Sequence, residues 1–252
     1  MDTLFLDSSE KMRYIAVRGQ GSRLHFRMAS VLATEPKVQG EINPGDAMTG
    51  IALNRTGRRA YFPMVWSRRA ADAHLEAFFD PIRVPPAEWQ ENLESRRCIL
   101  PCSWYYVMNQ GLNGIFNPSF FREDYAAMDD RFCVRFQTAR PAPPKKAGRK
   151  RKGSPPEPSR EAETPAEEPV MYFAGVYRVV EYKEIRYPAF TLLTQPVKER
   201  HRSFSDRQPI LLPEECIDDW ISPDTDPLET VKHALEGFTY EDVTCDSPVS
   251  SR

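Results

Sequence analysis

Short runs of alternating apolar and polar residues dominate the chain and predict β-strands, with fewer segments at helical spacing between them. The most apolar run covers residues 96–108 and reads RRCILPCSWYYVM. Two cations open this run and an aromatic cluster ends it. A strand this apolar needs cover on both faces, so it is predicted to lie in the core, with any site beside its end.

The pattern on either side of this run predicts further strands and helices. Before it come a short strand at residues 14–17, a helix at 24–32, a turn at 42–46, strands at 47–53 and 60–66 joined by a turn at 54–57, and helices at 68–79 and 87–95. After it come strands at 132–136, 170–177, 187–194 and 210–212, with a polar loop at 201–209, and helices at 213–221 and 228–237. The tail from residue 241 is predicted to fray.

Residues 140–169 differ from the rest of the chain. They hold eight of its 23 prolines and no aromatic residue, isoleucine, leucine, valine or methionine. Such a segment cannot bury enough surface to offset the entropy of ordering, so we expect a disordered insertion. The sequence thus predicts one domain from residues 1–139 and 170–240, with a flexible tail at 241–252. The basic stretch at 145–152 is either part of a solvated linker or a phosphate-binding arm.

Composition narrows the class of protein. A hydrophobic fraction of 40% in 252 residues supports a substantial core, and a net charge of -2 gives no global attraction to nucleic acid. No apolar run is long enough to cross a membrane and no leader peptide is evident, so we expect a cytoplasmic protein. The five cysteines lack CxxC spacing. They are expected to be buried free thiols rather than metal ligands, although Cys98 and Cys102 share a strand face, and no cofactor is implied.

Four blocks, in order, resemble the SOS-response-associated peptidase (SRAP) family, whose members shield abasic sites in single-stranded DNA. They are RRCILPCSWYYVM at 96–108, FAGVY at 173–177, FTLLT at 190–194 and FSDRQPILLP at 204–213, with weaker matches in NPG at 43–45 and MVW at 64–66. The resemblance implies an α+β fold in which mainly antiparallel, curved sheets form a barrel-like core with short flanking helices.

The chain departs from the family pattern at the positions that carry chemistry. The family's nucleophile is a cysteine at position 2, where this chain has Asp2, and a carboxylate cannot supply the sulfur of a thiazolidine ring. The family's acid/base glutamate falls at Val107, and an aliphatic side chain can neither donate nor accept a proton. The family's histidine falls at Ser205, and Trp104 replaces a glycine. The resemblance therefore implies a family scaffold without the cross-linking chemistry.

Five residues at or near the family positions are candidates for DNA binding. They are Trp66, Arg83, Trp104, Asp206 and Arg207, with single-stranded DNA as the partner that the resemblance implies. An alternative is that Asp206 and Arg207 form an ion pair that holds a loop, and that Trp66 belongs to the core.

Three functions remain open from the sequence. The first is a catalytically degenerate SRAP-like protein that binds single-stranded or damaged DNA. The second is an active enzyme of the family with relocated groups, and the third is a non-enzymatic module that contacts a protein partner through its Trp- and Tyr-rich surface. No P-loop, GxSxG, HExxH or GxGxxG motif points to another enzyme class.

Overall fold

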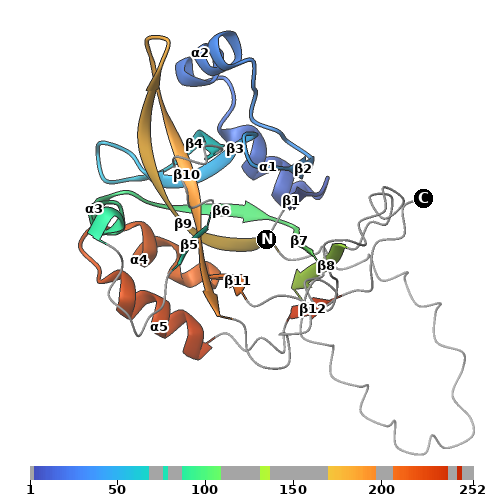
Figure 1. Cartoon of the computed structure of the whole chain (residues 1–252), viewed down its shortest axis with the longest axis vertical. Coiled ribbons are helices and arrows are strands. Elements are labelled where there is room, and N and C mark those ends of the chain that lie inside the picture. Colours follow the sequence, from blue (N-terminus) through green and yellow to red (C-terminus); the bar gives the residue numbers. More distant parts are fainter. Residues whose placement is uncertain are drawn as a thin grey trace, which may run out of the picture.

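The computed structural model describes residues 3–67, 76–78, 87–108, 131–136, 170–196, 207–237 and 243–245. These residues form two β-sheets with short helices around them (Figure 1), which confirms the predicted α+β class. The strands are β1 Thr3–Leu6, β2 Gly40–Ile42, β3 Ala47–Leu53, β4 Arg59–Trp66, β5 Glu76–Phe78, β6 Arg97–Cys102, β7 Trp104–Met108, β8 Arg131–Phe136, β9 Met171–Tyr182, β10 Ile185–Pro196, β11 Arg207–Pro209 and β12 Val243–Cys245. The helices are α1 Glu10–Arg18, α2 Arg23–Leu32, α3 Ala87–Ser95, α4 Ile217–Ile221 and α5 Pro227–Gly237, with a 3₁₀ turn at Glu214–Cys216 before α4.

Five strands close into a barrel in the order β10-β4-β3-β6-β9, because β9 also pairs with β10. Four of the five pairings are antiparallel, and β10 with β4 is the parallel one. The fully buried side chains include Met48, Met64, Phe173 and Phe190 from these strands. The barrel-like core with mainly antiparallel strands is therefore confirmed.

A second sheet has the strand order β12-β8-β7-β1-β2 and continues from the barrel through Ser103. The Ser103 N–H donates to the Phe5 carbonyl over 2.8 Å, and the Ser103 hydroxyl oxygen accepts from the Asp7 N–H over 2.8 Å. These bonds tie the chain to β1 at the point where it leaves the barrel. The predicted single strand at 96–108 is therefore two strands in two different sheets.

The prediction of a strand at residues 14–17 is wrong, because these residues lie in helix α1. Ser9 caps this helix by accepting from the Met12 N–H over 3.3 Å. Met12 and Ile15 are buried at a spacing of three residues, while Tyr14 and Val17 are exposed. The cap and the packing of one helical face favour a helix more strongly than the β-propensity of Tyr14 and Val17 favours a strand.

Four other predictions fail, and in three of these cases the residues form a short strand that pairs with another strand. Residues 76–78, predicted as helix, form β5 on β10, and residues 207–209, predicted as loop, form β11 on the end of β10. Residues 210–212, predicted as a strand, contribute only an isolated bridge from Leu211 to Phe173. Residues 243–245, placed in the frayed tail, form β12 on β8. Pairing with a distant strand satisfies backbone groups whatever the local pattern favours.

Other predicted elements are confirmed, among them α2, α3 and the hairpin of β3 and β4. The predicted insertion at 140–169 lies outside the described residues. Strands from both sides of it pair within the barrel, since β9 lies against β6. Among the helices that the structure describes, none is long and apolar enough to span a membrane.

Candidate functional site

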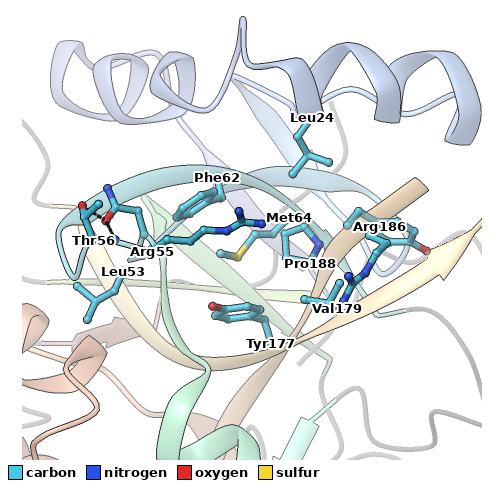
Figure 2. A pocket seen from close by; sticks show the side chains of 12 residues that line it. Leu24, Leu53, Arg55, Thr56, Phe62, Met64, Tyr177, Val179, Arg186 and Pro188 are labelled. Atoms are coloured by element: carbon cyan, nitrogen blue, oxygen red, sulfur yellow. Dashed lines mark hydrogen bonds between the residues drawn. The ribbon is translucent and has the colours of Figure 1, made fainter. Parts of the chain in front are cut away.

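The two ends of the barrel carry different structural features. At one end, β6 continues into β7, and β9 begins beside it, with Cys102 paired to Met171. At the other end, the β3–β4 and β9–β10 hairpins and helix α2 enclose a pocket of about 670 Å³ (Figure 2). The family resemblance places its reactive positions at the first end.

The first strand reaches that end by pairing with β7. Thr3, the first described residue, pairs with Tyr106, and Phe5 pairs with Trp104. Tyr106 directly precedes Val107, which stands at the family's glutamate position. The N-terminal strand is thus adjacent to the end of β7. Asp2 lies outside the described residues, and only the backbone of Val107 is described.

The segment that carries the family's D-R motif runs past the same end. Arg207 of β11 pairs with Pro196 at the end of β10. The Leu212 N–H donates to the Tyr172 carbonyl over 2.9 Å, and Tyr172 pairs in turn with Pro101 of β6. The backbone of residues 207–212 therefore lies at the end of the barrel where β6 leads into β7. Ser205 and Asp206 lie outside the described residues, as does Arg83, and the side chain of Arg207 is not described.

Three aromatic side chains cluster on one face of β1 and β7. Phe5 stacks on Trp104 with ring centroids 4.2 Å apart and an interplanar angle of 8°. Tyr106 meets the edge of Phe5 at 6.3 Å and 87°. Trp104 and Phe5 are partly exposed, whereas Tyr105 points to the other face and packs on Phe173 at 5.3 Å. Trp104, a sequence candidate for DNA contact, is therefore part of an aromatic surface beside the site.

Trp66, another sequence candidate for DNA contact, has a different environment. Its side chain is fully buried and stacks on Phe190 with ring centroids 5.8 Å apart. Its indole N–H has no hydrogen-bond partner among the described residues. Because no surface of the ring is accessible, Trp66 cannot stack on a base in this structure, and we leave it out of the proposed DNA surface.

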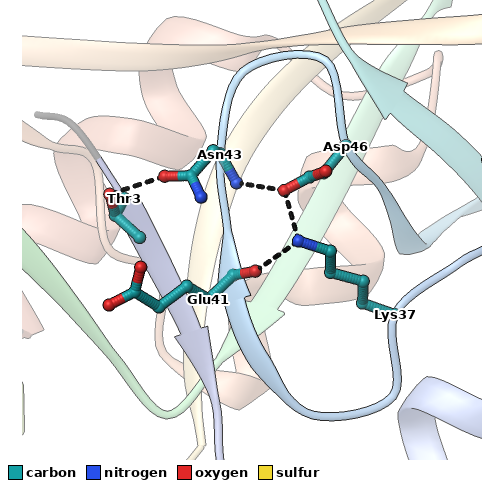
Figure 3. A network of polar contacts seen from close by, with 5 residues as sticks. All are labelled: Thr3, Lys37, Glu41, Asn43 and Asp46. Atoms are coloured by element: carbon teal, nitrogen blue, oxygen red, sulfur yellow. Dashed lines mark hydrogen bonds and ion pairs between the residues drawn. The ribbon is translucent and has the colours of Figure 1, made fainter.

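A polar network links β1 to the turn that follows β2 (Figure 3). The Thr3 hydroxyl donates to Asn43 Oδ1 over 2.8 Å, and the Asn43 N–H donates to Asp46 Oδ2 over 2.8 Å. The Lys37 ammonium donates to the same Asp46 oxygen over 2.6 Å and to the Glu41 carbonyl over 2.8 Å. These contacts hold the start of β1 against the turn. The sequence predicts the turn, but it does not show that Thr3 bonds to it, because Thr3 and Asn43 are 40 residues apart.

The three cysteines whose side chains the structure describes do not replace the family's nucleophile. Cys98 and Cys102 are fully buried, and Cys216 is buried beside the start of α4. Burial raises the pKa of all three thiols above the ordinary value of 9.0. They are therefore protonated at neutral pH, and thiolate is the nucleophilic form. The described residues include no group of three or more His, Cys, Asp or Glu side chains that could hold a metal ion.

Comparison with known proteins identifies the family. A family model described as SOS response associated peptidase (SRAP) matches residues 69–252 of this chain. No curated protein matches the chain by sequence.

Solved structures resemble the whole chain. A crystal structure of a protein from Bacteroides thetaiotaomicron has a TM-score of 0.55 at 15% identity, covering 98% of this chain and 91% of that one. A phage-related protein from Bordetella bronchiseptica has a TM-score of 0.57 at 14% identity, covering 99% and 95%. A second protein from Bordetella bronchiseptica has a TM-score of 0.51 at 13% identity, covering 100% of both chains. At these identities the likeness concerns the fold alone.

Proposed function

The chain belongs to the SRAP family, which associates it with the DNA-damage response, and on that premise we propose that it is a catalytically degenerate member. In this proposal it binds single-stranded or damaged DNA without forming the covalent adduct of the family. The cytoplasmic location expected from the sequence is part of the same proposal.

The observation that carries the proposal is the backbone arrangement at one end of the barrel. The pairing of Thr3 with Tyr106 and the contact of Leu212 with Tyr172 bring three family segments to that end. These contacts belong to the two sheets of the fold, so they hold the backbone of the three segments together whichever side chains the segments carry. In this proposal the chain keeps the backbone arrangement of the family site but lacks the reactive side chains.

The side-chain types at the family's reactive positions support the loss of chemistry. By resemblance, Asp2, Val107 and Ser205 stand where the family has cysteine, glutamate and histidine. Val107 cannot transfer a proton, and a serine hydroxyl does not titrate near neutral pH, so neither supplies general acid/base catalysis. The buried thiols of Cys98 and Cys102 offer no replacement for the missing sulfur.

Retained DNA binding is supported by the partly exposed rings of Phe5 and Trp104, with the buried Tyr106 packed against Phe5. Aromatic side chains bind single-stranded nucleic acid by stacking on bases, and this is worth about 1–3 kcal/mol per base. Trp104 is partly exposed, and Phe5 fixes the orientation of its ring. Arg207, which keeps its place in the family's D-R motif, is the proposed phosphate contact from β11.

The test is a pair of gels with one labelled single-stranded oligonucleotide that contains an abasic site. We expect no adduct on a denaturing gel and a shift on a native gel that weakens as salt rises, because counterion release drives phosphate binding. An adduct formed by this chain would overturn the proposed degeneracy and favour an enzyme with relocated groups. No shift at low salt would remove DNA binding from the proposal.

Matched variants locate the DNA surface. Trp104→Ala is expected to weaken DNA binding about tenfold through the loss of one stacking platform. Tyr14→Ala removes an exposed aromatic side chain from α1, far from β7 in the sequence, and should leave the affinity unchanged. If Trp104→Ala abolishes co-purification of a protein partner while DNA affinity stays constant, the chain is an interaction module instead.

A further inference from the structure

The pocket at the other end of the barrel is a second candidate site. It is lined by the tip of the β3–β4 hairpin, the end of β9, the start of β10 and Leu24 of α2 (Figure 2). Along β10, Arg186 and Pro188 line the pocket, whereas Thr194 to Pro196 pair with β11 near the family site. The two sites are therefore at opposite ends of the same strand, and the inference below goes beyond the proposed function.

The size and walls of the pocket suit a small organic ligand. Its volume of about 670 Å³ lies within the range of roughly 300–1,000 Å³ that is usual for such sites. Aromatic and apolar side chains form most of the lining, including Phe62, Met64, Tyr177 and Pro188. Walls of this kind offer flat surfaces for a planar ring system.

Two arginines give the pocket its charge. Arg55 and Arg186 both line it and are both exposed to solvent. Figure 2 shows Arg55 extending across the pocket between Phe62 and Tyr177, with Arg186 at the right of the view beside Val179 and Pro188. Neither guanidinium forms an ion pair with a described carboxylate, whereas nearby Arg59 is paired with Asp218 over 2.7 Å. Two unneutralised guanidinium groups favour an anionic ligand with planar oxygens.

The charge of this end of the barrel is not that of the whole chain. The three segments around the pocket, residues 23–32, 53–62 and 177–188, contain eight lysines and arginines but only two acidic residues. Residues 214–229, which include α4, contain seven acidic residues and no lysine or arginine. The net charge of -2 thus conceals a basic surface around the pocket, which attracts anions over a range set by the Debye length.

The loop that carries Arg55 is rigid. The side-chain oxygen of Asn54 accepts from the Thr56 N–H, the Thr56 hydroxyl and the Arg58 N–H at 2.7–3.0 Å. Gly57 adopts the left-handed conformation that closes the turn, with φ of 70°. The backbone that carries Arg55 is therefore ordered before any ligand arrives, so ligand binding does not have to order the loop.

We propose that this pocket binds a nucleotide, with the base against the aromatic and apolar walls and the phosphate on Arg55 and Arg186. A planar base matches the walls, and a phosphate matches two guanidinium groups bidentately. Either a free nucleotide or a base-and-phosphate unit of a nucleic-acid strand presents this chemistry. An acidic peptide would match the arginines but would leave the aromatic walls without a planar partner.

The experiment is a fluorescence titration of the full chain with ADP that carries an N-methylanthraniloyl group. Unlabelled AMP, adenosine, inorganic phosphate and a 5′-phosphorylated oligothymidylate serve as competitors. We expect saturable binding that AMP displaces more strongly than adenosine or phosphate alone, because base and phosphate bind together. Displacement by the oligonucleotide but not by AMP would show that the base and phosphate in the pocket belong to a nucleic-acid strand rather than to a free nucleotide.

The variants separate pocket binding from general charge. Arg55→Gln and Arg186→Gln are each expected to weaken binding about tenfold or more, and the double variant about a hundredfold. Arg58→Gln removes the same charge from the same loop without touching the pocket lining, so its affinity should stay within about twofold. The proposal is overturned by no saturation at millimolar nucleotide, or by equal losses in the Arg58 and Arg55 variants.

The same variants distinguish this inference from the proposed function. Binding of abasic single-stranded DNA through Trp104 should be unaffected by Arg55→Gln if the family site alone holds that DNA. Nucleotide binding should in turn be unaffected by Trp104→Ala. Loss of nucleotide binding in Trp104→Ala would show one continuous surface and contradict a separate nucleotide pocket.

Discussion

Replacing Arg97 with alanine is expected to loosen the helices from the barrel. Arg97 opens β6, and its side chain is only 2% exposed. One guanidinium nitrogen donates to the Thr225 carbonyl over 3.0 Å, and a second donates to the carbonyls of Ser222 and Thr225. The guanidinium carbon also lies 5.7 Å from the ring centroid of Trp220. One side chain therefore fastens the link between α4 and α5 to the barrel.

The expected loss follows from these contacts. A hydrogen bond to a charged group contributes about 1.5–3 kcal/mol, and Arg97 bonds two carbonyl oxygens. Ser222 and Thr225 are partly exposed, so water replaces some of the lost bonding and favours the lower end of that range. Loss of the ring contact and of the packed aliphatic stem adds about 1 kcal/mol. We therefore expect Arg97→Ala to lower the free energy of unfolding by about 4 kcal/mol.

Urea unfolding followed by far-UV circular dichroism measures this loss. With a slope of about 3 kcal/mol per molar urea, the midpoint should fall by more than 1 M. Arg97→Lys keeps the charge but loses the forked donors of the guanidinium. Its unfolding midpoint should therefore lie between those of the unmodified chain and Arg97→Ala. Arg96→Ala is the matched control, because Arg96 makes a partly exposed ion pair with Glu91 that contributes little. A loss below 1 kcal/mol for Arg97→Ala would refute the reasoning.

Other substitutions test the buried thiols, the barrel interior and the polar network. Because burial raises the pKa of Cys98 and Cys102 above 9.0, their stabilising effect is complete below pH 9 and is lost as the pH rises further. Above pH 9, each thiol should make the free energy of unfolding, measured in urea titrations, fall by about 1.4 kcal/mol per pH unit. Cys98→Ala or Cys102→Ala should make this fall less steep. An unchanged slope would assign the pH dependence to other groups. Gly175→Ala places a methyl group 3.1 Å from Cys98 Sγ, so it should destabilise the chain by about 1–3 kcal/mol in urea, and a neutral result would mean that the barrel relaxes freely. Asp46→Ala removes the acceptor of Lys37 and should cost about 1 kcal/mol in thermal unfolding, whereas an unchanged melting temperature would show that the network contributes nothing.

Local signals in the sequence predicted the elements that depend on them. The helix at 87–95 and the hairpin of β3 and β4 are confirmed because their periodicity and turn residues lie within one short segment. Helix α1 is not predicted, because Tyr14 and Val17 favour a strand, although its cap, Ser9, is also local. The capping residue was the better signal, since it satisfies the first free N–H groups of a helix.

Long-range pairings were not accessible from one sequence. The parallel pairing of Ala189 with Val65 closes the barrel across a gap of more than a hundred residues. Arg97 resembles a surface cation in the sequence, yet its carbonyl partners make it a buried link. The nucleotide pocket was missed for the same reason, because Arg55 and Arg186 lie on hairpins that are adjacent only in the folded chain.

The degenerate-enzyme account is tested most directly by adduct formation with abasic single-stranded DNA, measured for this chain and for a restored variant. The variant combines Asp2→Cys, Val107→Glu and Ser205→His, which returns the family's three groups to a frame that is proposed to be intact. The account predicts no adduct from the unmodified chain and an adduct from the variant on a denaturing gel. An adduct from the unmodified chain, or none from a folded variant, would contradict it.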